Sequence, residues 1–141
     1  MKMRYLLQAS AVCAALASPA AAHGPDEGKG EIVTPNFAQQ IPNIPGKSLI
    51  AVIVDYPPGA KSPPHRHAAS AFIYGFVVSG SVRTHVDGEG VKIVKAGESF
   101  YEAPGSHHLE GGNASESEPA KLLAVFVVDT DDKELTTPDK E

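Results

Sequence analysis

The sequence predicts an all-β sandwich or barrel, and three observations carry that prediction. Short apolar runs rich in β-branched residues recur along the chain, with turn residues about every eight to twelve positions. Glycine and proline are frequent, at 13 and 12 of 141 residues, which favours turns over long helices. No apolar period of about 3.6 residues persists far enough to predict a core helix.

The first 22 residues are expected to lie outside the fold. Lys2 and Arg4 precede a mostly apolar stretch, residues 5–17, and small residues end at Ala22. This pattern predicts a secretory signal peptide and a periplasmic or secreted protein. The apolar core is shorter than the ~20 residues that span a bilayer, so no membrane partner is expected after cleavage. The competing interpretations are an N-terminal core helix and lipidation of Cys13.

The remaining chain divides into an arm, a barrel and a tail. Residues 23–46 are expected to be a mostly irregular N-terminal arm, because three prolines exclude a helix there. The barrel is predicted over residues 47–130. Residues 131–141 are predicted to form a polar C-terminal tail that frays.

Within the barrel, each apolar run predicts a strand and each Gly or Pro cluster a turn. The runs lie at residues 49–54, 71–78, 81–86, 91–94, 100–103 and 122–128. Asp87-Gly88 between two of them is a strong hairpin signal. With shorter extended segments, seven or more strands are expected.

Composition excludes several classes of protein. The chain has 12 Lys and Arg against 17 Asp and Glu, a net charge of -5, and loss of the signal peptide would leave -7. Without a basic excess, a nucleic-acid partner is not expected. Hydrophobic residues make up 42% of the chain and charged residues 21%, which excludes disorder throughout. Cys13 is the only cysteine, so the mature chain would hold no disulfide.

Histidines suggest a metal site. His65 and His67 are two residues apart, so in extended chain both side chains point to one face and Arg66 points away. His107 and His108 follow a Pro-Gly turn and point to opposite faces, so only one of them can join the first pair. Three neutral imidazoles suit Fe, Mn, Ni, Cu or Zn.

The spacing of these residues resembles the two motifs of the cupin superfamily. The first motif matches Gly59, His65, His67 and Gly80, and the second matches Gly97, Pro104, Gly105 and His108. The resemblance covers roughly residues 49–128. It implies a double-stranded β-helix, or jelly-roll, barrel with a metal ion at His65, His67 and His108. It also implies a small-molecule ligand or substrate and a homodimer, which could form through residues 32–54.

The sequence departs from the family at one metal ligand. A glutamate is expected a few residues after His67, but residues 68–74 contain no carboxylate. One interpretation is a bare three-histidine site with open positions, as some cupin dioxygenases hold iron. In another, Glu102 supplies the carboxylate from the second motif, and in a third the metal has been lost. We expect the bare site ahead of the other two.

Other polar residues are weaker candidates for the site. On the alternating strand 81–86, Arg83 could hold an anionic substrate and His85 a proton, if that face lines the barrel. Tyr74 and Tyr101 could donate hydrogen bonds into a pocket. The competing interpretation places these side chains on an outer face or at the rim. His23 would be the mature N-terminus and could chelate copper, although a flexible arm that binds nothing specific is the simpler expectation.

Two classes of function follow. The first is a metal-dependent oxidoreductase, most plausibly a dioxygenase of a small organic substrate, by resemblance to the cupins. The second is a non-catalytic periplasmic barrel that binds a small molecule or a metal ion. The fold alone does not choose between them.

Overall fold

A computed structural model describes residues 30–140 as an all-β structure of eleven strands. The predicted signal peptide and His23 lie outside the described residues. The strands are β1 (Ile32–Gln40), β2 (Lys47–Tyr56), β3 (Lys61–Ser62), β4 (His65–His67), β5 (Phe72–Ser79), β6 (Ser81–Val86), β7 (Lys92–Lys95), β8 (Ser99–Glu102), β9 (His107–Asn113), β10 (Ala120–Asp129) and β11 (Thr136–Pro138). Over this range, no helix is long and apolar enough to cross a membrane.

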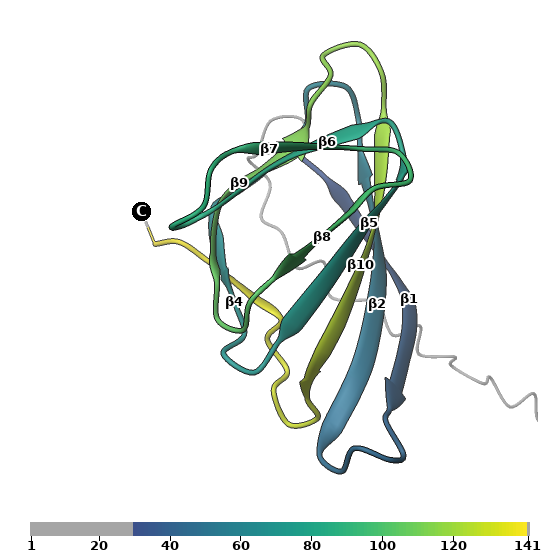
Figure 1. Ribbon diagram of the computed structural model, residues 1–141, viewed down its shortest axis with the longest axis vertical. Coiled ribbons are helices and arrows are strands. Elements are labelled where there is room, and N and C mark those ends of the chain that lie inside the picture. Colours follow the sequence, from purple (N-terminus) through teal and green to yellow (C-terminus); the bar gives the residue numbers. More distant parts are fainter. Residues whose placement is uncertain (1–29, 141) are drawn as a thin grey trace, which may run out of the picture.

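The strands form two antiparallel sheets that face each other (Figure 1). The first sheet has the order β1-β2-β10-β5-β8, and its long strands run down the right side of the view. The second has the order β11-β4-β9-β6-β7, with β3 paired to β9. Strands that neighbour in sequence often lie in different sheets, as in a jelly roll. The predicted all-β, jelly-roll class is confirmed.

The core lies between the two sheets and follows the alternation of side chains along the strands. On β10, residues alternate between buried and partly buried positions from Ala120 to Val128. Leu122 stands opposite Val54 on β2 and Val77 on β5, and the three side chains share one buried cluster. A second buried cluster contains Ile73 and Phe126. Burial of these faces is the main favourable term in folding.

Residues 30–46, the described part of the predicted arm, are less irregular than the sequence predicts. Ile32–Gln40 forms the nine-residue strand β1, which pairs with β2 at the edge of the first sheet. The register shifts between Pro35 and Phe37, where a bulge accommodates the proline. Proline excludes a helix, but it is compatible with an edge strand because one side of that strand needs no donors.

The C-terminal tail also differs from its prediction. Instead of fraying, Thr136–Pro138 forms β11 and pairs with β4. The preceding Leu135 packs against the second core cluster. A three-residue strand has no signal of its own in the sequence, because tertiary pairing supplies its stability.

Each of the six apolar runs coincides with a strand to within one residue at the ends where it extends beyond it, whereas β9 gave no apolar signal. Its sequence, His-His-Leu-Glu-Gly-Gly-Asn, is polar and rich in glycine, a composition that disfavours strands. It forms a strand because β6 and the short strands β3 and β4 supply its hydrogen-bonding partners.

The turn between β5 and β6 requires glycine at residue 80. Gly80 has φ +71°, and a Cβ there would lie 2.4 Å from the carbonyl oxygen of Pro119. Gly88 in the next hairpin has a similar φ, +80°, but open space around it. Conformation alone costs a non-glycine residue about 1–2 kcal/mol in the left-handed region.

Gly80→Ala is therefore expected to lower the free energy of unfolding clearly more than Gly88→Ala, which should cost about 1–2 kcal/mol. The difference reports the collision with the Pro119 carbonyl. Urea denaturation of both variants, each compared with the unmodified chain, measures it. Equal losses in the two variants would contradict the close approach.

Candidate metal centre

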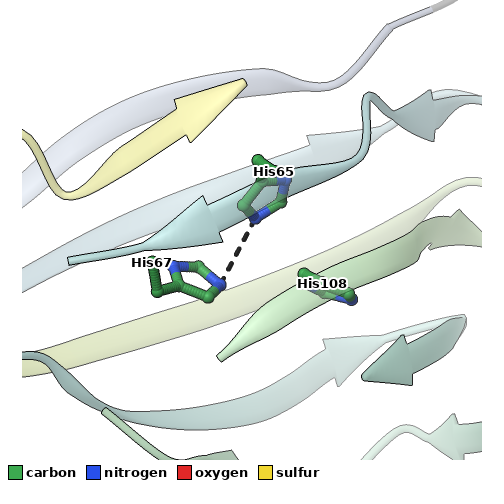
Figure 2. Close-up of side chains that lie close together, drawn as sticks. All are labelled: His65, His67 and His108. Carbon is green, nitrogen blue, oxygen red and sulfur yellow. Dashed lines mark hydrogen bonds between the residues drawn. The ribbon is translucent and has the colours of Figure 1, made fainter. Parts of the chain in front are cut away.

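Three histidines from two neighbouring strands converge in the second sheet (Figure 2). β4 presents both His65 and His67 to the same side, and β9 presents His108, which is paired in register with His65. The Nε2 atoms of His65 and His67 are 3.3 Å apart. One ring nitrogen from each of the three residues lies within 4.8 Å of the others. The grouping predicted from the H-x-H spacing and the second motif is present.

Glu102 completes the cluster from the facing sheet. It is the last residue of β8, and the Pro-Gly turn after it carries the chain across to β9 and His108. Its Oε2 lies 3.0 Å from Nε2 of His67, and its Oε1 lies 3.5 Å from Nδ1 of His108. The carboxylate is only 4% exposed. β8 and the turn to β9 thus place beside the three histidines the carboxylate that the second interpretation names.

Hydrogen bonds to the outer nitrogens orient two of the rings. His65 donates its Nδ1–H to the carbonyl oxygen of Pro63 at 2.8 Å, which leaves the Nε2 lone pair directed at the cluster. His108 places Nε2 2.9 Å from Oγ1 of Thr84. His67 packs beside Phe126, with ring centroids 5.9 Å apart. Its Nδ1 is the one buried side-chain polar atom without a hydrogen-bond partner among residues 30–140.

Burial and mutual contact shift the pKa values of these groups. Burial lowers the pKa of His65 and of His108 below the ordinary value of 6.5, so both rings are neutral at pH 7. Burial alone would raise the pKa of Glu102. The hydrogen bond from His67 and the charge of the neighbouring imidazoles outweigh it, and the pKa of Glu102 is lowered. At neutral pH, His65 and His108 therefore offer neutral ring nitrogens beside the ionised carboxylate of Glu102.

This donor set fits a divalent transition-metal ion. Nε2 of His67 lies 3.3 Å from Nε2 of His65 and 3.0 Å from Oε2 of Glu102, so one cation could be shared by these three donor atoms. The carboxylate adds a negative charge in a site that excludes most water. Imidazoles with one carboxylate are typical ligands of Fe, Mn, Ni, Cu and Zn. The hydrogen bonds from His65 and His108 to outer partners are those that hold metal-binding imidazoles in place.

The neighbours of these ligands point outward, as the alternation predicts. Arg66 is exposed and places Nη2 3.2 Å from Nδ1 of His107. His107 in turn contacts the carboxylate of Asp139 through Nε2 at 2.8 Å. His107 therefore belongs to a separate cluster on the outer side of the sheet.

Three weaker candidates lie outside the cluster. On β6 the inward residues are Val82 and Thr84, because the apolar side chain selects the buried face. Arg83 and His85 occupy the opposite face, and Arg83 forms an ion pair with Glu110 at 2.6 Å. This is the competing interpretation, in which both side chains lie on an outer face.

Tyrosines expected at the pocket also face outward. Tyr74 is 42% exposed and hydrogen-bonds to Ser99 at 2.8 Å. Tyr101 is 61% exposed and stacks on Phe72. Thr84, which contacts His108, is the site residue that the sequence analysis missed. Thr84 is two residues from the apolar Val82 on the same strand, so both side chains point to the same face, and this spacing would have identified Thr84.

A small cavity begins at Thr84, next to the cluster. Its inner wall includes Val86 and Phe100, and its rim includes Lys92 and Tyr101. The cavity has a volume of about 10 Å³, which is room for about one water molecule. The ring of Phe100 can take its place in this wall because residue 75 is a glycine: a Cβ at that position would lie 2.6 Å from the ring.

Comparisons with known proteins agree with this geometry. Residues 52–126 match the family model described as a cupin domain. A Klebsiella pneumoniae protein with a double-stranded β-helix domain is 19% identical, with a TM-score of 0.62 over 84% of this chain and 90% of that one. An oxalate oxidase is 25% identical, with a TM-score of 0.56 over 72% of this chain and 53% of that one.

A third solved structure extends the range of similar proteins. The DMSP lyase of Ruegeria pomeroyi is 21% identical, with a TM-score of 0.53, and 66% of this chain covers 45% of that protein. The chain thus spans only about half the length of the oxalate oxidase and of the lyase. No curated protein matches the sequence.

The lowered pKa values of His65 and His108 predict how stability depends on pH in the metal-free protein. Below about pH 6.5 the unfolded chain takes up protons that the folded site resists, so stability falls as the pH decreases. Each histidine contributes up to about 1.4 kcal/mol per pH unit. Urea denaturation of chelator-treated protein between pH 5.5 and 7.5 measures this slope.

The control for this experiment is His85→Ala, which removes an imidazole from the outer face and should keep the slope. His108→Ala should reduce it, since one of the two resisting groups is gone. A metal-free protein that is equally stable at pH 5.5 and pH 7.5 would contradict the assignment of neutral, buried imidazoles.

Proposed function

Since the chain belongs to the cupin domain family, we propose that it is a metal-binding cupin with one divalent transition-metal ion held by His65, His67, His108 and Glu102. The observation that carries this proposal is the convergence of three imidazoles and one buried carboxylate between the two sheets. The metal can be Fe, Mn, Ni, Cu or Zn, because the donor types suit all five.

We further propose that the protein is a metal-dependent oxidoreductase of a small organic substrate, of the dioxygenase class. When bound, a redox-active ion supplies Lewis-acid or redox chemistry at the cluster. The chain's own residues contribute the surroundings. Thr84 holds the ring of His108 through Oγ1, and Phe100 lines the small cavity that begins at Thr84. The oxalate oxidase, a neighbour at 25% identity, is an oxidase of a small organic acid, which supports this class.

The second candidate is a non-catalytic barrel that binds a metal ion or a small molecule. The cavity at Thr84 favours it, because about 10 Å³ admits water but no organic substrate. Entry of an organic molecule through this cavity would require the rim between Lys92 and Tyr101 to open. The two candidates therefore differ in whether a substrate can reach the cluster.

We also propose where the protein acts and in what assembly. A signal peptide ending near Ala22 would deliver it to the periplasm or the medium, and N-terminal sequencing of the exported protein tests this.

For assembly, β1 is a nine-residue edge strand without a charged residue, and all its side chains are exposed. Such an edge can pair with a second copy. Light scattering should give a dimer mass that Phe37→Lys reduces to a monomer.

The metal proposal predicts about one ion per chain in protein purified without an affinity tag. His65→Ala/His67→Ala should abolish the metal content, because two of the four donors are lost. Glu102→Gln should weaken metal affinity by about ten-fold or more, because the only carboxylate is neutralised. Plasma mass spectrometry and chelator competition measure the two effects.

Matched controls are available for both changes. Glu110→Gln neutralises an outer carboxylate on the same sheet as His108 and should leave the metal content unchanged. His85→Ala does the same for an outer imidazole. A folded protein that contains no metal and acquires none from Fe, Mn, Ni, Cu or Zn solutions would overturn the proposal. If metal is present, O₂ uptake with small organic acids separates the oxidoreductase from the non-catalytic barrel.

A further inference from the structure

The strand that carries two of the proposed ligands has only three residues, and the C-terminal segment covers one of its edges. β4 lies between β9 and β11 in the second sheet. Thr136 pairs with His67, and Pro138 pairs with His65. In Figure 1, the yellow C-terminal chain runs beside β4. Without β11, β4 would be an edge strand with one neighbour, and short edge strands open readily.

Two backbone hydrogen bonds bracket the H-R-H triplet. The amide of Ala68 donates to the carbonyl oxygen of Leu135 at 3.1 Å, and the amide of Asp139 donates to that of Pro64 at 3.0 Å. The C-terminal segment is therefore hydrogen-bonded to the chain immediately before and immediately after β4. The second bond lies next to Pro63, whose carbonyl oxygen orients the ring of His65.

Side chains anchor the segment at both ends. Leu135 packs against the second core cluster, which contains Phe126, the neighbour of His67. Asp139 accepts a hydrogen bond from Nε2 of His107 at 2.8 Å. His107 in turn contacts Arg66, the central residue of β4, at 3.2 Å. The outer cluster thus connects the tail, β9 and β4 on the side opposite the proposed metal ion.

We propose that residues 135–139, here called the C-terminal clamp, position His65 and His67 for metal binding. This rests on the proposed function. The clamp lies outside the residues that match the cupin domain, 52–126, so it is an addition to that part of the fold. Its residues donate nothing to the metal. They act by restricting β4, which keeps the two Nε2 atoms facing the carboxylate of Glu102 from the other sheet.

The test uses full-length protein carrying Leu135→Ser and Asp139→Ala together. The control is Asp131→Ala with Lys140→Ala, which changes two exposed residues of the same tail. Metal-free protein is titrated with Co²⁺, whose visible spectrum reports both affinity and ligand geometry. The clamp variant should bind Co²⁺ about 10–100-fold more weakly, the range seen when outer-sphere supports are lost, and with an altered spectrum. The control should match the wild type.

A second measurement keeps the inference testable whatever the stability of the double variant. Asp139→Asn retains an oxygen acceptor for His107, whereas Asp139→Ala does not, so the Asn variant should restore most of the affinity lost in the Ala variant. Hydrogen exchange of residues 64–68 in the metal-free protein should be faster in the clamp variant than in the control.

Each outcome decides a separate point. Unchanged Co²⁺ affinity and spectrum in a folded clamp variant would overturn the clamp and leave the metal site intact. Failure of the wild type to bind Co²⁺, or any of the five proposed ions, would overturn the proposed function. The hydrogen-exchange comparison would then still show whether the tail restrains β4.

Discussion

The structure depends on keeping a polar cluster satisfied between two apolar sheets. Three imidazoles and a carboxylate are expensive to bury unless each finds a partner. The carbonyl of Pro63, the hydroxyl of Thr84 and the carboxylate of Glu102 meet most of that demand. Apart from Nδ1 of His67, the nitrogens that remain face one another, and this convergence makes the region suited to a cation rather than to further packing.

The two sheets contribute to the cluster in different ways. The second sheet supplies the imidazoles and the bonds that orient them, whereas the first supplies the carboxylate from the end of β8. The Pro-Gly turn that links β8 to β9 therefore determines whether Glu102 can face His108. A ligand set divided between sheets also couples metal binding to the packing of the sheets, because the ion would bridge them.

Peripheral strands carry part of this arrangement. β11 makes β4 an internal strand, and the outer contacts of Asp139 with His107 connect it to β9. β1 extends the first sheet on its far side, with all side chains exposed. The polar cluster is thus supported by β11 at the edge of the second sheet, while the edge of the first sheet, at β1, is an uncharged strand open to pairing.

The sequence alone was sufficient for the fold class, six of the strands and the three-histidine grouping. Those features depend on local order: apolar alternation sets the buried face, and the H-x-H spacing puts both rings on one side. Long-range contact decided the rest. Glu102 reaches the cluster across a Pro-Gly turn, and the alternation of side chains along a strand does not predict directions beyond such a turn. The glycine-rich β9 and the short β11 form because neighbouring strands supply their hydrogen-bonding partners. Arg83 and His85 face outward because Val82, on the other face of β6, is buried in the core. The free energy gained by burying apolar surface decides which face of the strand points inward.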